Sequence, residues 1–302
     1  MNNIKKAEVI IIGGSYAGLS AAMALGRSLR TVLIIDSGLP CNRQTPQSHN
    51  FITHDGSAPA EIARQAKAQV LKYPTITFVT DLVITGRETG NGFEVITQSG
   101  QSYEGQKLIF ATGIADQMPD ITGFAACWGI TAIHCPYCHG FEFKQQETAI
   151  MANGERAIHL AGLINNLTPN LSIITSGTSE FNDEQWQKLR DHSITVIEKP
   201  VKEVVHTKGQ ISRVIFADGS TIKVTALYAA LPFKQHTDIP ETLGCELTEQ
   251  GYIKIDQFQK TTVKGIFACG DNSAMMRSVA NAVYTGNLTG AIVNKELVDD
   301  SF

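Results

Sequence analysis

Apolar runs separated by short glycine-containing turns dominate the first forty residues of the chain. Residues 7–12, AEVIII, predict a buried strand, and the Ala- and Leu-rich segment 19–29 predicts a helix. Residues 31–35 predict a second strand, which ends at Asp36. A strand, a turn, a helix and a strand in this order indicate a βαβ unit.

The turn inside this unit, GGSYAG at residues 13–18, has the composition of a dinucleotide-binding loop. Gly13 permits a tight turn, Gly18 permits close packing of helix and strand, and the start of the helix offers backbone amides to a pyrophosphate. Ser15 replaces the middle glycine of G-x-G-x-x-G, and Asp36 stands where a carboxylate would hold the ribose hydroxyls. A plain glycine-rich turn would not explain Asp36, so we expect dinucleotide binding.

Residues 147–177 repeat this order of elements, with ETAIMA as a strand, NGERAIHLAGLI as a turn and helix, and LSIITSG as the next strand. Residues 183–191 predict a solvated helix. Strand-like runs in residues 194–224 are separated by turns at Lys208-Gly209 and Asp218-Gly219, which predicts a small antiparallel layer. The sequence therefore predicts an α/β protein with two Rossmann-like, three-layer ββα, dinucleotide-binding domains.

Length and composition fit a soluble, folded protein. A chain of 302 residues with 43% hydrophobic residues is long enough for two domains. A net charge of -4 offers no basic surface for nucleic acid, and no apolar stretch approaches the ~18–20 residues that span a bilayer. Six mostly isolated cysteines do not make a disulfide framework, so we expect a reducing compartment, the cytoplasm.

A pair of cysteines, Cys135 and Cys138, lies between His134 and His139 in the segment IHCPYCHG. Two thiols at this spacing can close a disulfide and neighbouring imidazoles can move protons, so thiol redox chemistry is the leading interpretation. C-x-x-C-H is also the attachment signature of c-type haem, but no export signal is evident, and a structural zinc site would need a second close pair of ligands. The other cysteines stand alone and are interpreted as packing residues: Cys41, Cys127, Cys245 and Cys269.

Two later apolar runs, KLIFATG at residues 107–113 and GIFACGD at residues 265–271, complete a pattern with the N-terminal unit. Together they resemble the two-dinucleotide flavoprotein family, the FAD-dependent pyridine nucleotide-disulphide oxidoreductases. The resemblance implies a discontinuous FAD-binding domain of residues 1–115 and 246–302, and an NAD(P)H-binding-like domain of residues 116–245 that carries the dithiol. The FAD contacts that it implies are Gly13, Gly14, Ser15, Ala17, Gly18, Asp36, Asn50, Thr112, Gly113, Gly270, Asp271 and Val279.

The position of the dithiol in the second domain resembles that in low-molecular-weight thioredoxin reductases. The resemblance implies that Cys138 faces the flavin, that Cys135 exchanges with the substrate, and that the protein is a homodimer. Where those enzymes carry Asp after the second cysteine, this chain has His139. An imidazole titrates near neutral pH and can act as acid or base, and His134 is a second candidate for this work.

The second predicted nucleotide loop, residues 152–157, is degenerate. It reads ANGERA and lacks the first glycine of G-x-G-x-x-A, while Glu155 adds negative charge where a pyrophosphate would approach. No basic residue between Arg156 and Lys188 replaces the arginines that grip the 2'-phosphate of NADPH, and no acid stands at the strand end to select NAD. Use of NADPH is therefore doubtful, and a divergent NADPH site is the alternative.

The sequence thus predicts an FAD-dependent thiol-disulfide oxidoreductase that moves electron pairs between FAD, the Cys135–Cys138 pair and an external disulfide or dithiol. That partner would be a thioredoxin-like protein or a small molecule. Oxygen or ferredoxin would be the electron partner, because the damaged nicotinamide site resembles those of the dithiol oxidases of gliotoxin and holomycin biosynthesis and of ferredoxin-dependent flavin thioredoxin reductases. Two alternatives stay open: an oxygen-dependent dithiol oxidase of small-molecule thiols, and a flavin-binding redox sensor without turnover.

Overall fold

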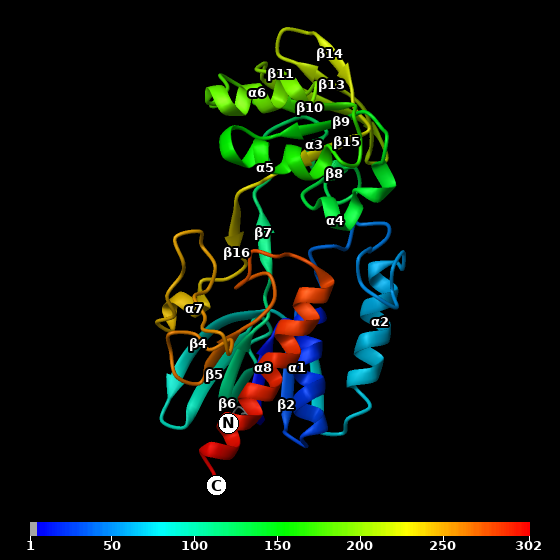
Figure 1. The fold of residues 1–302 in the computed structure, drawn as a ribbon. Coiled ribbons are helices and arrows are strands. Elements are labelled where there is room, and N and C mark those ends of the chain that lie inside the picture. Colours follow the sequence, from blue (N-terminus) through cyan, green and yellow to red (C-terminus); the bar gives the residue numbers. More distant parts are fainter. Residues whose placement is uncertain (1–4) are drawn as a thin grey trace. The chain divides into compact units, whose positions relative to one another are not determined.

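The computed structural model describes residues 5–302, and the chain divides into two compact units (Figure 1). Unit 1 contains the chain up to Arg43, Phe51–Ala115 and Phe233–Phe302. Unit 2 contains Gln44–Asn50 and Asp116–Pro232. The N-terminal and C-terminal parts of the chain therefore fold together in unit 1.

Unit 1 is built on a 7-stranded sheet in the order β3-β2-β1-β6-β5-β4, with β17 also paired to β6. The strands β1, β2, β3, β6 and β17 run parallel, whereas β4 and β5 form an antiparallel extension. The bounds are β1 (Lys5–Ile12), β2 (Val32–Asp36), β3 (Ile76–Thr80), β4 (Val83–Thr89), β5 (Gly92–Thr97), β6 (Ser102–Phe110) and β17 (Ile266–Ala268). Residues 108–110 of the first late apolar run pair with both β1 and β17, so β6 lies inside the sheet.

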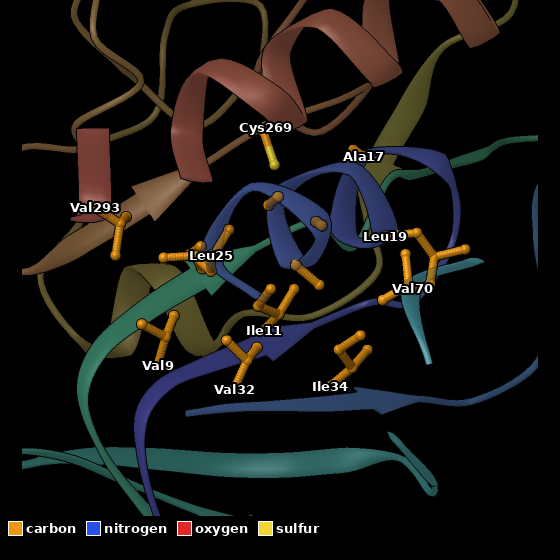
Figure 2. Packing of buried hydrophobic residues seen from close by; sticks show 14 of the residues in the cluster. Val9, Ile11, Ala17, Leu19, Leu25, Val32, Ile34, Val70, Cys269 and Val293 are labelled. Atoms are coloured by element: carbon orange, nitrogen blue, oxygen red, sulfur yellow. The ribbon is translucent and has the colours of Figure 1, made fainter. Parts of the chain in front are cut away.

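The helices of unit 1 are α1 (Tyr16–Arg27), α2 (Pro59–Val70), α7 (Ile239–Thr242) and α8 (Val279–Asp299). Helix α1 begins at Tyr16, three residues earlier than the apolar pattern predicts, because Ser15 already occupies the N-cap position. Figure 2 shows side chains of β1 and β2, including Val9, Ile11 and Val32, packed beneath α1, with Val293 of α8 joining the same cluster. Burial of these apolar side chains fixes α1 between the sheet and α8.

Unit 2 holds a 5-stranded parallel sheet, in the order β11-β10-β9-β15-β8, and a 3-stranded antiparallel sheet, β12-β13-β14. The strands are β8 (Ala132–Ile133), β9 (Thr148–Met151), β10 (Leu171–Ile174), β11 (Thr195–Ile197), β12 (Val201–Thr207), β13 (Gln210–Phe216), β14 (Thr221–Lys223) and β15 (Ala226–Ala229). The helices are α3 (Phe124–Cys127), α4 (Pro136–His139), α5 (Gly154–Ile164), α6 (Asp183–Asp191) and the 3-10 turn η1 (Phe141–Phe143). Two parallel Rossmann-like sheets confirm the predicted fold class.

Two of the four chain crossings between the units lie at short strands, β7 (Ile114–Asp116) and β16 (Phe233–Gln235), and these strands pair with each other. The return to unit 1 at Phe233 differs from the expected return at residue 246. Ile239 and Cys245 are buried in a core cluster of unit 1, so the chain rejoins that unit before the sequence pattern signals it. Within residues 5–302, no helix combines the length and apolar character needed to cross a membrane.

Candidate cofactor and redox site

The predicted dinucleotide loop connects β1 to α1 and leaves no room for side chains at its glycines. Gly13 has φ 106°, and a β-carbon there would lie 2.2 Å from the carbonyl oxygen of Ala111. A β-carbon on Gly18 would lie 1.9 Å from the carbonyl oxygen of Gly13. Glycine is therefore required at both positions, the first for its backbone conformation and the second for the close approach of helix and loop.

The carboxylate of Asp36, at the end of β2, holds this loop in place. Its Oδ2 accepts a hydrogen bond from the amide of Gly14 at 2.5 Å, and its Oδ1 accepts one from the amide of Gly38 at 2.8 Å. A β-carbon on Gly14 would lie 2.9 Å from Cβ of Asp36 and 2.7 Å from the ring of Phe78. The acid that the sequence singled out thus lies against the predicted phosphate loop.

Two further segments predicted to line the cofactor are hydrogen-bonded to each other through Asn272. Its side-chain amide donates to the carbonyl oxygen of Phe110 at 2.9 Å and to Oγ1 of Thr112 at 3.2 Å. Thr112 belongs to the loop after β6, and Asn272 follows Gly270 and Asp271 in the loop after β17. The two loops are therefore held side by side at the ends of adjacent strands.

The remaining predicted contacts in unit 1 lie around the start of α8. Ser278 caps this helix by accepting a hydrogen bond from the amide of Asn281 at 3.1 Å, and Val279 is its first residue. Asp271 forms an ion pair with Arg277, with 3.7 Å between Oδ2 and Nε. Asp271, one of the predicted FAD contacts, therefore has a cationic partner within the chain.

The structure gives Asn50 a different place from the other predicted FAD contacts. Asn50 is exposed, has φ 60°, and belongs to the segment Gln44–Asn50, which groups by contact with unit 2. Residues in this segment pack on unit 2, since a β-carbon on Gly129 would lie 3.0 Å from Oγ1 of Thr45. Unit 1 therefore gathers the predicted contacts other than Asn50, namely Gly13, Gly14, Ser15, Ala17, Gly18, Asp36, Thr112, Gly113, Gly270, Asp271 and Val279.

The chemistry of this region of unit 1 fits a flavin dinucleotide. Gly13 and Gly14 carry no side chains of their own, as the close approach of a pyrophosphate to this loop requires. The side chain of Asn272 is fully buried, and its Oδ1 has no hydrogen-bond partner among residues 5–302. A buried polar atom without a partner costs free energy, so a ligand or water that donates to Oδ1 would be stabilised there.

In unit 2, Cys135 and Cys138 form a disulfide, with 5.3 Å between their α-carbons. Cys135 is the N-cap of α4, and its Sγ accepts a hydrogen bond from the amide of Cys138 at 3.2 Å. Pro136, the first residue of α4, fixes the backbone between the two cysteines. Both cysteines are partly exposed, as a disulfide that exchanges with an external thiol must be.

The two histidines that flank the disulfide have different surroundings. His139 is desolvated, and burial lowers the pKa of its imidazole, whereas the carboxylate of Glu142 raises this pKa and His49 lowers it further. His134 lies with its ring 6.0 Å from the ring of Trp128, whose Nε1 donates to Oδ2 of Asp116 at 3.0 Å. A neutral His139 can accept a proton, which fits the role of a base.

The second predicted nucleotide loop, residues 152–157, is hydrogen-bonded through Asn153 to the loop after β10. Asn153 caps α5, where its Oδ1 accepts hydrogen bonds from the amides of Gly154 and Glu180, both at 2.9 Å, and its Nδ2 donates to the carbonyl oxygen of Thr178 at 2.9 Å. Oε2 of Glu180 lies 3.5 Å from the position of a β-carbon on Gly154. Backbone amides in the first turn of a helix can bind a pyrophosphate. In α5 the amide of Gly154 instead donates to the side chain of Asn153, and the carboxylate of Glu180 lies nearby.

Two more carboxylates border this loop. Oε1 of Glu155 accepts a hydrogen bond from Gln185 at 2.7 Å, and Oε1 of Glu198 accepts one from the amide of Ser179 at 2.7 Å. The Ser179 amide lowers the pKa of Glu198, which keeps it ionised. The basic residue of this turn, Arg156, donates to the carbonyl oxygen of Ala230 at 3.4 Å. Carboxylates from three different segments therefore border this loop, and its one arginine is bound to a backbone carbonyl.

Some of these residues carried no recognisable signal in the sequence. His49 and Glu142 lie close to His139 only in the folded chain, and Asn272 follows the recognised Gly-Asp pair as an ordinary loop residue. The expectation that all four isolated cysteines pack in cores is wrong for Cys41, which is exposed because it lies in the loop after β2. The other three are buried: Cys127, Cys245 and Cys269.

Comparisons with known proteins agree with this architecture. Residues 7–286 match the family described as pyridine nucleotide-disulphide oxidoreductase. The chain is 32% identical to "Thioredoxin reductase tcpT" of Claviceps purpurea (strain 20.1), over 97% of this chain and 95% of that protein.

Solved structures are similar over almost the whole chain. The oxidoreductase from Agrobacterium tumefaciens has a TM-score of 0.91 and 36% identity, covering 97% of this chain and 99% of that one. The putative thioredoxin reductase TrxB from Bacillus anthracis has a TM-score of 0.93 and 29% identity, covering 98% of this chain and 100% of that one.

The two dinucleotide-type sheets and the disulfide define a flavoprotein oxidoreductase of the thioredoxin reductase-like class. The chain belongs to the pyridine nucleotide-disulphide oxidoreductase family, and it binds FAD as members of this family do.

Proposed function

We propose that this flavoprotein moves electron pairs between FAD, the Cys135–Cys138 disulfide and an external dithiol, without using NADPH. The observation that carries the proposal is the loop at the start of α5. The side chain of Asn153 accepts hydrogen bonds from the amides of Gly154 and Glu180, and the carboxylate of Glu180 lies beside Gly154. Three carboxylates border this loop, and residues 157–187 contain no lysine or arginine that could grip a phosphate. The external dithiol belongs to a small molecule or to a thioredoxin-like protein.

Cys135 is the sulfur that exchanges with the external thiol. The amide of Cys138 already donates to its Sγ, and the same hydrogen bond would stabilise the thiolate that forms when the disulfide opens. A substrate thiol gives its proton to His139, and the resulting thiolate attacks Sγ of Cys135. The bond between the two cysteines breaks, and Cys138 keeps the electron pair as a thiolate.

The second substrate thiol then displaces Cys135 and closes the substrate disulfide, and its proton ends on Cys135. The substrate has lost two electrons, the protein disulfide has gained them, and the two protons reside on His139 and Cys135. When bound, FAD supplies two-electron acceptance from the reduced cysteine pair.

Electrons leave the protein by a route other than a nicotinamide, with oxygen or a ferredoxin-type carrier as the acceptor. Oxygen-dependent oxidation of small-molecule dithiols is the first version to test, because it needs no docking partner. The proposal places the protein as a homodimer in the cytoplasm, where its cysteine usage suits a reducing environment.

The test is anaerobic reduction of the oxidised flavoprotein, followed by the loss of flavin absorbance. Dithiothreitol should bleach the flavin quickly, and NADPH or NADH should act roughly 10- to 100-fold more slowly or not at all, since each missing charge-assisted phosphate contact is worth about 1.5–3 kcal/mol. The variant C138S should no longer respond to dithiothreitol, whereas C41S, a matched cysteine outside the disulfide, should respond normally. Rapid bleaching by micromolar NADPH would contradict the proposal.

Turnover separates an enzyme from a redox sensor. With excess dithiothreitol in air, steady oxygen consumption over many equivalents of protein is the expected result. A single reversible reduction of the disulfide, with no further consumption of oxygen or of an added carrier, would favour the sensor.

A further inference from the structure

The redox helix α4 is followed directly by the turn η1, and this short connection brings a carboxylate within electrostatic reach of His139. Glu142 lies in η1, three residues after His139. Its side chain is 33% exposed, and its Oε1 lies 3.5 Å from Nε2 of His49. Glu142 also raises the pKa of Tyr228, a buried residue of β15 whose own burial is the larger cause.

His49 reaches this place from a distant part of the sequence. It belongs to Gln44–Asn50, the segment that groups by contact with unit 2 although it connects β2 to α2 of unit 1. The imidazole is only 16% exposed, and the rings of His49 and His139 lie edge to face with 6.4 Å between their centroids. One carboxylate and two imidazoles therefore form a cluster next to Cys138.

We propose that His49 and Glu142 are positioning residues for His139, and that the three side chains form one proton-handling cluster for the exchange of the Cys135–Cys138 disulfide. This inference rests on the proposed function. His139 takes the proton of the attacking thiol, and the imidazolium that forms is stabilised by the carboxylate of Glu142. His49 holds that carboxylate through the contact between Nε2 and Oε1.

Glu142 and His49, which face His139, have opposite effects on the pKa of its imidazole. Burial, the largest effect, disfavours the protonated imidazole of His139, the negative charge of Glu142 favours it, and His49 disfavours it. The tyrosyl group of Tyr228, which also faces Glu142, stays neutral over the working range because burial raises its pKa. Glu142 and His49 therefore adjust, in opposite directions, the pKa that burial gives to His139.

The experiment is a histidine titration of the oxidised flavoprotein, labelled at the imidazole carbons and followed by NMR, with H139Q used to assign the His139 signal. In E142Q the titration midpoint of His139 should fall, because the stabilising carboxylate is gone. In H49Q it should rise, because the loss of the direct electrostatic effect of His49, which opposes protonation, outweighs the loss of its contact with Glu142. The control E184Q removes an exposed carboxylate of α6, paired with Lys188, and should leave the midpoint unchanged.

A second measurement ties the cluster to disulfide exchange. The rate of reduction by dithiothreitol near neutral pH should fall about three- to tenfold in E142Q, a fraction of the usual effect of a general base, and E142D should recover most of it. In the H139Q background the further change E142Q should have no effect. Equal shifts of the His139 midpoint in E142Q and H49Q, or no shift in either, would overturn the inference.

The titration needs neither NADPH nor turnover, so the two proposals fail separately. If NADPH bleached the flavin quickly and the His139 midpoint still shifted in opposite directions in E142Q and H49Q, the proposed electron route would be wrong and the proton-handling cluster would stand. If dithiothreitol reduced the flavin as expected but the His139 midpoint did not move in the variants, only the proposed cluster would be wrong.

Discussion

Gly286 of α8 lies so close to Ala17 of α1 that a β-carbon on Gly286 would stand 2.1 Å from the carbonyl oxygen of Ala17. One helical turn further along, a β-carbon on Gly290 would stand 2.5 Å from the carbonyl oxygen of Ala21. The two helices therefore touch through backbone atoms along adjacent turns. This contact holds the start of α8, with Val279, near the end of α1 that carries the predicted phosphate loop.

Substitution of Gly286 by alanine should force α1 and α8 apart. We expect the free energy of unfolding to fall by about 1–3 kcal/mol, the usual effect of overpacking, and the affinity for FAD to fall with it. The matched control is Gly162, a glycine within α5 with no atom within 4 Å of its β-carbon position. G162A should leave stability unchanged or raise it by about 0.5–1 kcal/mol, as measured by urea denaturation. Equal losses in both variants would refute the packing explanation.

Lys107 of β6 anchors the other end of α8. Its side chain is 6% exposed, and Nζ lies 2.7 Å from Oδ2 of Asp300 and 3.2 Å from Oε2 of Glu296. K107M should lower the free energy of unfolding by about 1–3 kcal/mol, because the carboxylates lose a buried partner. K295M, which breaks an exposed ion pair with Asp299 on the same helix, should change it by less than about 1 kcal/mol.

The ion pairs of Lys107 also predict that the stability of the fold depends on pH in the acid range. Lys107 lowers the pKa of Asp300, and the lysines Lys260 and Lys107 outweigh burial to lower the pKa of Glu296. Carboxyl groups with a lowered pKa stabilise the fold above their unfolded pKa near 4, and this stability is lost as the pH falls through the folded values. Stability of the unmodified protein should therefore fall more steeply between pH 5 and pH 3 than that of K107M. The measurement is denaturation at several pH values. If the free energy of unfolding of the two proteins fell in parallel with pH, the ion pairs of Lys107 would not explain the acid sensitivity.

The roles of the two redox cysteines can be read from absorbance. In C135S the remaining Cys138 thiolate should produce a long-wavelength charge-transfer band with the flavin, and in C138S this band should be missing. Only the cysteine that faces the flavin can donate charge to it. A band in C138S and none in C135S would exchange the two assignments.

Alkylation should distinguish the exposed cysteine from the buried ones. Burial raises the pKa of Cys127 to about 11 and that of Cys269 to about 12, so these thiols are both inaccessible and protonated at neutral pH. Mass spectrometry after brief treatment of the native, oxidised protein with a maleimide should find label on Cys41 only. After reduction, Cys135 and Cys138 should react as well. Early labelling of Cys269 would show that the core around α8 opens.

Much of the fold could be predicted because its signals are local. The buried strand before Gly13, the helix after Ser15 and the acid at Asp36 follow each other within one βαβ unit, and a short apolar run reports its own burial. The turns at Lys208-Gly209 and Asp218-Gly219 were recognisable for the same reason, since positive φ at these glycines reflects an intrinsic property of the residue. The structure places an antiparallel layer at this point.

Long-range contacts carried no such signal. The segment Gln44–Asn50 joins unit 2 through packing against residues such as Gly129, and nothing in its own pattern distinguishes it from a loop of unit 1. The chain returns to unit 1 at Phe233, and this point depends on the burial of Ile239 in the core of unit 1, which is a tertiary contact. Local periodicity contains no information about which distant surface covers a side chain.

The sequence by itself determined the kind of chemistry: a C-x-x-C pair flanked by histidines, a dinucleotide loop with its acid, and a second loop without a phosphate clamp. These features are sets of residues adjacent in the chain, and their chemistry depends on spacing and side-chain type. Only the tertiary structure decided which groups surround them. The carboxylate of Glu142 and the imidazole of His49 meet beside His139 because two segments about ninety residues apart fold against each other, and electrostatic interactions depend on distance in space rather than along the chain.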